Sequence, residues 1–165
     1  MMSLYQPLSF VNGQWVGATS GATFEVVNPA TGQVVESVAD LSAADCVKAI
    51  DAAEAAFPAW AGLTAKERSA ILRRWFNLMT EHTEELAHLI TEEMGKPLAE
   101  ARGEVAYGAS FVEWFAEEGR RIYGDVIAPH MTDKRILAIK QPVGVVAAIT
   151  PWNFPLAMIT RKVSP

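Results

Sequence analysis

The sequence predicts an α/β protein, and three kinds of stretch carry that prediction. Turn sequences at residues 12–13 and 28–32 are flanked by β-forming residues, which predicts two hairpins at the start of the chain. Helical periodicity with capping signals then dominates residues 42–119. Residues 143–149 are apolar on both faces and rich in β-branched residues, as is typical of a buried strand in a parallel sheet.

Composition excludes several classes of protein. The chain has 165 residues, 50% of them hydrophobic, which is typical of a folded globular protein. A net charge of -5 argues against nucleic-acid binding, because phosphate contacts need a basic patch. Residues 1–6 lack the features of a signal peptide, and no apolar run approaches the ~20 residues that cross a membrane. The single Cys46 excludes an internal disulfide and fits a reducing compartment, so we expect a soluble, cytoplasmic protein.

Four helices are predicted from start and stop signals. Hydroxyl side chains that can cap a helix begin three of them, at Ser42, Thr64 and Thr83. The fourth begins at Pro97, in the first helical position, and extends to about Gly119. The predicted stops are Pro58, which disfavours helical geometry at Phe57, and Gly95 in a left-handed C′ position.

The fourth helix is amphipathic, with small residues at Ala101 and Gly108 on its apolar stripe, which predicts that another backbone packs closely there. Glutamates outnumber cations across the helical block. We expect these glutamates to form a solvated surface and not a metal cage. They are Glu81, Glu84, Glu85, Glu92, Glu93, Glu100, Glu104, Glu113, Glu117 and Glu118.

The C-terminal part of the sequence changes from extended to sharply turned. Residues 125–129 and 135–141 predict a two-stranded ribbon around a turn at residues 132–133. On sequence alone, an ordinary edge hairpin and a ribbon that pairs with another subunit are both open. Pro151 ends the predicted strand at 143–149, and a helix restarts near Leu156. Asn153 therefore lies at the carboxyl end of a predicted parallel strand, where open α/β sheets bind their ligands.

Five motifs in this order resemble the aldehyde dehydrogenase superfamily, and most closely its succinate-semialdehyde dehydrogenase branch. They are residues 10–15, 28–32, 92–97, 119–124 and the Thr-Pro-Trp-Asn-Phe-Pro run at 150–155. The resemblance implies the N-terminal hairpins and helices of the cofactor-binding domain (1–124), a β-ribbon oligomerisation arm (125–142), and the first Rossmann-like strand with its turn and next helix (143–165). The fold is expected to be truncated, since family members continue well beyond Pro165.

Asn153 is the candidate catalytic residue. Its amide offers two uncharged N–H donors, which suit stabilisation of an oxyanion on a carbonyl under attack, although asparagine is also common in turns. The resemblance implies that Asn153 is the side-chain half of the oxyanion hole for a cysteine thiohemiacetal. It also implies that Ile149, Thr150, Pro151, Trp152 and Asn153 contact the nicotinamide half of NAD or NADP. Trp152 as a plain core residue is the competing interpretation.

Arg161 is the candidate substrate-binding residue, because arginine can grip a carboxylate with two parallel hydrogen bonds. The resemblance implies that it clamps the distal carboxylate of a semialdehyde, and the alternative is a solvated helix charge. The family's general-base glutamate and nucleophilic cysteine are missing, and Cys46 is a poor substitute without a nearby histidine. His82 and His88 are too far apart on a helix for zinc, so no metal is expected.

We therefore expect the parent protein to be an NAD(P)-dependent semialdehyde dehydrogenase that works as a homo-oligomer, dimer or tetramer. This chain alone is expected to be inactive. The rival hypothesis is a non-catalytic assembly module or a remnant of an aldehyde dehydrogenase.

Overall fold

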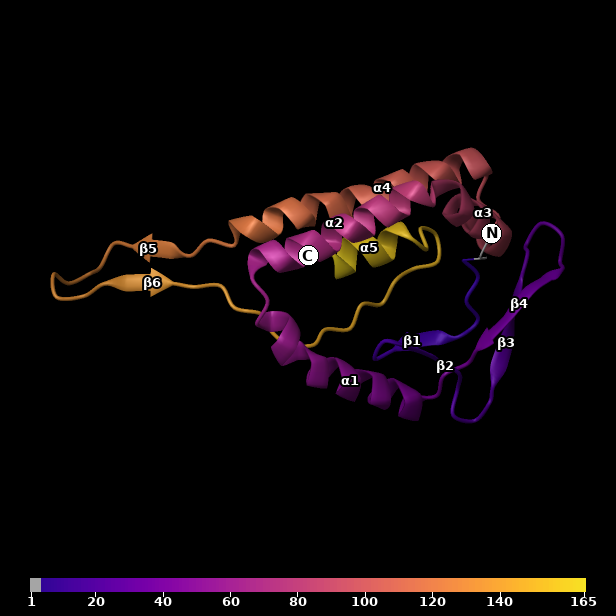
Figure 1. The fold of residues 1–165 in the computed structure, drawn as a ribbon, viewed down its shortest axis with the longest axis horizontal. Coiled ribbons are helices and arrows are strands. Elements are labelled where there is room, and N and C mark those ends of the chain that lie inside the picture. Colours follow the sequence, from indigo (N-terminus) through magenta and orange to yellow (C-terminus); the bar gives the residue numbers. More distant parts are fainter. Residues whose placement is uncertain (1–3) are drawn as a thin grey trace.

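The computed structural model describes residues 4–165, and four helices form its centre. They are α2 (Ala65–Glu81), α3 (Thr83–Met94), α4 (Leu98–Glu118) and α5 (Ala157–Val163). The long helix α4 packs against each of the other three (Figure 1). Two buried apolar clusters fill the spaces between these helices, and Leu156, just before α5, packs against both. The C-terminal segment is thus fastened to the helical core.

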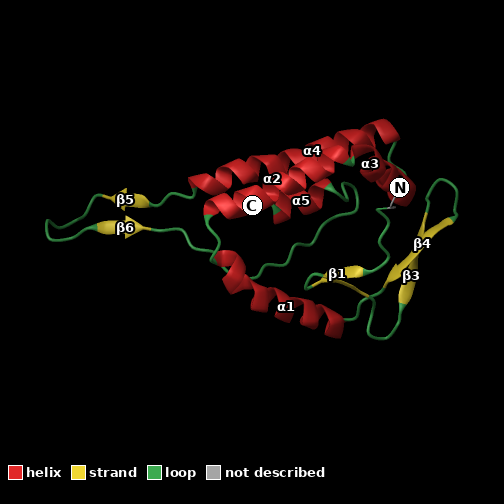
Figure 2. Ribbon diagram, viewed as in Figure 1, coloured by secondary structure: helices red, strands yellow, loops and turns green. Residues whose placement is uncertain are grey.

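Two antiparallel hairpins open the described chain, as the turn sequences predict (Figure 2). Strands β1 (Ser9–Val11) and β2 (Gln14–Val16) meet at Asn12 and Gly13, whose φ angles of 50° and 76° are those of a type I′ turn. Strands β3 (Thr23–Val27) and β4 (Val34–Ala39) form the second hairpin. The expectation that the chain begins without a signal peptide concerns residues 1–6. Of these, residues 1–3 lie outside the part of the chain that the structure describes.

Helix α1 (Ala43–Ala61) begins at the predicted cap, because the Ser42 hydroxyl and the Asp45 carboxylate form a capping box. The predicted end at Phe57 is wrong, since α1 continues through Pro58 to Ala61. Proline removes the hydrogen bond that its own N–H would make, and its ring crowds the carbonyl four residues earlier. Near the end of a helix that loss is small, and the Pro58 carbonyl still accepts a 3.0 Å bond from the Gly62 N–H.

Helices α2 and α3 follow each other almost without a break. Thr64 forms the predicted capping box with Glu67 at the start of α2. The predicted Thr83 cap is wrong, because its hydroxyl donates to the carbonyl of Thr80 at 2.8 Å, in the last turn of α2. His82 occupies the cap position with φ −99° and ψ 22°, so the chain never takes the extended geometry that a hydroxyl cap needs.

The predicted ribbon is confirmed, with β5 (Asp125–Ile127) antiparallel to β6 (Ile136–Ala138). It follows the short 3-10 helix η1 (Gly119–Arg121) and projects away from the helices at the left of Figure 1. Its strands are short and carry exposed apolar side chains, including Val126 at 86% and Leu137 at 69%.

Residues 143–149 do not form the predicted strand. They run as an extended segment without ladder partners, and Val143 and Ile149 are 93% and 89% exposed. A parallel strand exists only when neighbours accept and donate its hydrogen bonds, and within residues 4–165 no strand lies beside this segment. No helix in the described part of the chain is long and apolar enough to cross a membrane.

Candidate functional site

The site is the turn at residues 150–156 together with α5, which it leads into. Helical hydrogen bonding begins at the Phe154 carbonyl, which accepts from the Met158 N–H at 3.0 Å. Gly108 of α4 allows the approach of α5, since a Cβ there would lie 3.3 Å from the Ala157 Cα. The close approach predicted at Gly108 is therefore confirmed, and it holds the turn against α4.

A buried ion pair lies directly beneath the turn. Lys96, in the loop between α3 and α4, pairs with Glu104 of α4, and these residues are 8% and 2% exposed. The Lys96 Nζ also donates a 3.0 Å hydrogen bond to the Asn153 carbonyl and lies 3.9 Å from the centre of the Phe154 ring. The ammonium group thus contacts the turn at two consecutive residues.

Glu104 holds the start of α5. Its Oε1 accepts hydrogen bonds from the backbone N–H groups of Leu156 at 2.9 Å and Ala157 at 3.2 Å. These are among the donors that a helix leaves unpaired at its N-terminus, and α5 has no capping side chain of its own. A carboxylate from α4 therefore caps α5 from outside its own sequence.

Asn153 presents an exposed side chain while its backbone is held. Its carbonyl is bonded to Lys96, and within residues 4–165 its amide group makes no hydrogen bond. A fixed backbone with an exposed side-chain amide is the arrangement expected of a donor that binds a ligand oxygen. An ordinary turn residue has the same geometry.

A row of aromatic rings links the turn to Arg161 on α5. Phe154 meets Tyr107 edge to face at 6.5 Å between centroids, and Tyr107 meets Phe111 at 4.8 Å. The Arg161 guanidinium lies 5.5 Å from the Phe111 ring centre and pairs with no carboxylate in the part of the chain that the structure describes. Arg161 is thus an exposed cation beside apolar rings.

The predicted cofactor contacts lie on the exposed side of the turn. Ile149 and Trp152 are 89% and 78% exposed, so the interpretation of Trp152 as a core residue is wrong for the described chain. Within residues 4–165, the backbone groups of residues 149–152 make no hydrogen bonds. Free amides and carbonyls beside an open indole ring are suited to contact a flat, polar ring such as nicotinamide.

Lys96 and Glu104 are the site residues that sequence reasoning missed. Glu104 was expected on the solvated surface, and its near-complete burial corrects that expectation. The signal was in the spacing, because Glu104 lies three residues after Ala101 and four before Gly108 and so falls on the apolar stripe of α4. A charged residue on a buried stripe indicates a partner, and Lys96 is that partner.

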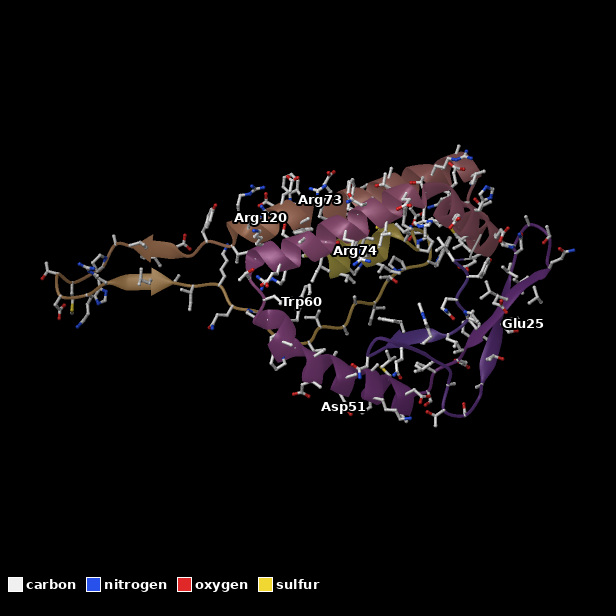
Figure 3. All side chains as sticks on the ribbon, in the orientation of Figure 1. Glu25, Asp51, Trp60, Arg73, Arg74 and Arg120 are labelled. Atoms are coloured by element: carbon white, nitrogen blue, oxygen red, sulfur yellow. The ribbon has the colours of Figure 1, made fainter. Side chains whose placement is uncertain are left out.

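The remaining chemical candidates lie elsewhere. Cys46 is exposed in α1, and the His82 imidazole Nδ1 lies 3.1 Å from the Glu85 carboxylate. Residues of α2, α4 and η1 line a shallow hollow, among them Arg73 and Arg120, but Arg73 is paired with carboxylates of α4. Figure 3 labels the two arginine side chains. Among the described residues, no group of three or more histidine, cysteine or acidic side chains could hold a metal ion.

The family model described as "Aldehyde dehydrogenase family" matches residues 15–165, which is most of the chain and includes the turn, Lys96, Glu104 and α5. The chain belongs to the aldehyde dehydrogenase family. Its resemblance to the succinate-semialdehyde branch is confirmed, because similar proteins are named glutarate-semialdehyde and succinate-semialdehyde dehydrogenases.

Two bacterial relatives match nearly the whole chain. A glutarate-semialdehyde dehydrogenase of Pseudomonas putida is 60% identical over 162 residues, which are 98% of this chain and 34% of that protein. The NADP-dependent succinate-semialdehyde dehydrogenase of Escherichia coli is 59% identical over 163 residues, covering 99% of this chain and 34% of that protein. The chain thus spans about a third of the length of the curated relatives it matches.

Solved structures share the fold as well as the sequence. A crystal structure of an Escherichia coli NADP-dependent enzyme superimposes with a TM-score of 0.95 at 60% identity, covering 96% of this chain and 33% of that one. A succinate-semialdehyde dehydrogenase from Burkholderia pseudomallei does so with a TM-score of 0.93 at 55% identity, covering 95% and 33%. The arrangement of this segment is therefore that of the N-terminal part of an aldehyde dehydrogenase.

Proposed function

We propose that this chain is the N-terminal part of an NAD(P)-dependent dehydrogenase that oxidises a short aldehyde carrying an anionic group to the carboxylic acid. The observation that carries the proposal is the turn at residues 150–156, which offers the exposed amide of Asn153 and is linked by aromatic rings to Arg161. Within residues 4–165, neither side chain has a hydrogen-bonding or ion-pair partner. Relatives named for succinate semialdehyde, glutarate semialdehyde and 3-sulfolactaldehyde support it, because each of these aldehydes carries a second, anionic group.

Each proposed residue has one task. The Asn153 amide donates to the aldehyde oxygen as a cysteine elsewhere in the complete enzyme adds to the carbonyl carbon and negative charge develops on that oxygen. Arg161 binds the distant anionic group and so sets the substrate's direction. Residues 149–152 would hold the nicotinamide of NAD or NADP, which accepts the hydride when it is bound.

The assignment of residues 125–142 as a ribbon that pairs across subunits, in a dimer or tetramer, stays a prediction. The exposed apolar side chains of β5 and β6 support it. The division at residues 124 and 142 and a cytoplasmic location are also predictions.

A chimera tests the proposed function. The matching segment of the Escherichia coli succinate-semialdehyde dehydrogenase is replaced by this chain, and NADPH formation from succinic semialdehyde is measured. We expect activity within about ten-fold of the parent enzyme, because the two segments are 59% identical and share their fold. A chimera with the parent's circular dichroism and oligomer size but no NADPH formation would contradict the proposal. The same exchange in the Pseudomonas putida relative provides a second host if the first does not fold.

A further inference from the structure

Among the described residues, the side chains of the ion pair between Lys96 and Glu104 make all their other polar contacts with the turn and the start of α5. Lys96 donates to the Asn153 carbonyl and faces the Phe154 ring, and Glu104 accepts from the Leu156 and Ala157 N–H groups. Apart from their bond to each other, both side chains therefore direct their charge at residues 153–157. Within residues 4–165, no other element forms a hydrogen bond with either side chain.

Fold stability does not explain a pair placed in this way. Burying an ammonium and a carboxylate carries a large desolvation penalty, and replacing such a pair by well-packed apolar residues is often neutral or stabilising. What apolar residues cannot provide is a directed bond to one particular carbonyl and two particular amides. Specifying one conformation is the best-attested use of buried charge, and the directed contacts of this pair fit that use.

The conformation it specifies is that of the residue proposed to bind the oxyanion. The Lys96 bond fixes the peptide plane that follows the Asn153 Cα, and Glu104 fixes the first turn of α5, three residues further on. An oxyanion donor works only when it is held in place before the charge develops. A donor on a mobile turn would lie too far from the oxyanion for part of the time and would stabilise it less.

We infer that Lys96 and Glu104 are positioning residues that hold the Asn153 turn in its working conformation. The inference deepens the proposed function and rests on it for the role of Asn153. The two residues act through the backbone of residues 153–157 and do not touch the reacting atoms.

The decisive variant is the double substitution Lys96→Met with Glu104→Leu, which keeps side-chain volume and removes both buried charges. In the 165-residue chain, we expect the melting temperature to stay the same or rise. The amides of Leu156 and Ala157 should exchange hydrogen about ten-fold faster, because each loses its acceptor. The Ser164 amide, which donates a 3.0 Å hydrogen bond to the Thr160 carbonyl at the C-terminal end of α5, serves as the internal reference. Unchanged exchange at Leu156 and Ala157 would overturn the inference.

The matched control is Arg102→Met with Glu84→Leu. It removes another ion pair of α4, formed with α3 at 2.8 Å. This pair is exposed, and its hydrogen bonds among the described residues do not involve the turn. We expect exchange at Leu156 and Ala157 to stay at the wild-type rate in this variant. Faster exchange in both double variants would mean that loss of any ion pair loosens α5, which also overturns the inference.

Kinetics in the chimera provide the second readout. With a stable fold, the Lys96→Met and Glu104→Leu pair should lower kcat by up to about 10²-fold with KM nearly unchanged, as expected for a misplaced group. Glu104→Gln, which keeps an acceptor oxygen for the two amides, should recover part of that loss. A full kcat in the double variant would refute the positioning role while leaving the proposed function intact. An inactive parent chimera would instead refute the proposed function, and the exchange rates would still decide on the ion pair.

Discussion

Gly108 of α4 lies against Leu156, so closely that a Cβ on the glycine would come within 2.3 Å of the Leu156 Cδ2. The leucine side chain could swing aside, but the Thr160 hydroxyl at 3.2 Å and the Ala157 Cα at 3.3 Å leave the added methyl no other space. This contact lets α5 sit on α4 and brings the turn within reach of Lys96 and Glu104.

Gly108→Ala should therefore destabilise the 165-residue chain by about 1–3 kcal/mol, the usual effect of overpacking a core. The measurement is urea denaturation followed by circular dichroism. Gly103→Ala is the matched control, because the same helix has open space around Gly103 and alanine favours helix by about 0.5–1 kcal/mol. Equal effects at the two positions would contradict the packing argument.

Asp45 predicts how stability changes in acid. The Thr19 hydroxyl above all, and then the Ser42 side chain and backbone, donate to its carboxylate and hold the pKa of Asp45 well below its ordinary value of 3.8. The unfolded chain thus binds a proton at a higher pH than the folded chain. The stabilisation is complete above about pH 5, well above the unfolded pKa, and is lost progressively as the pH falls towards the lowered folded pKa. Asp45→Asn should lower the urea midpoint at pH 7 and differ less from wild type at pH 3. An equal difference at both pH values would show that the charge is irrelevant.

Much of this fold could be predicted because its signals are local. The Asn12-Gly13 turn and the caps at Ser42 and Thr64 depend on a few adjacent residues, and the structure confirms each of them. Helix ends were harder to predict. Helix α1 continues through Pro58, and Thr83 does not cap α3, although both residues are typical of helix ends.

Two features depend on residues distant in sequence, and there the predictions were wrong. Residues 143–149 have the composition of a strand, but strand formation requires partners that the described chain does not place beside them. Glu104 looked like one of many surface glutamates, and only its contacts with Lys96 and the start of α5 show why it is buried. Spacing on the apolar stripe was the one local sign.

The isolated 165-residue chain should reduce neither NAD nor NADP with any aldehyde. Its single cysteine, Cys46, is exposed in α1, outside the turn at residues 150–156. The measurement is absorbance at 340 nm with the purified chain and its Cys46→Ala variant. Aldehyde-dependent reduction that survives Cys46→Ala would contradict this expectation, and reduction abolished by Cys46→Ala would identify an unexpected nucleophile.

Arg161→Ala, in the chimera, should weaken the reaction of an anionic substrate selectively. An anionic group must lose water to lie beside the rings of Phe111 and Tyr107, and a fixed guanidinium offsets that penalty. We expect kcat/KM to fall more for succinic semialdehyde than for butanal, which has no charge to pair. Expressed as the activation free energy derived from kcat/KM, the difference should be about 2–5 kcal/mol. Lys162→Ala removes the adjacent exposed cation and should affect both substrates little. An equal loss on the two substrates with Arg161→Ala would place this residue in folding or cofactor binding.

The most direct measurement is the steady-state kinetics of Asn153→Ala in the chimera, with the exposed Asn77→Ala as the control. If the Asn153 amide stabilises the oxyanion, kcat should fall on the order of 10²–10³-fold with KM nearly unchanged, because the hydrogen bond is made in the transition state. Asn77→Ala should leave both constants as they are. A kcat that holds while only KM rises would show that Asn153 merely positions the substrate, and the account of the turn as an oxyanion site would be wrong.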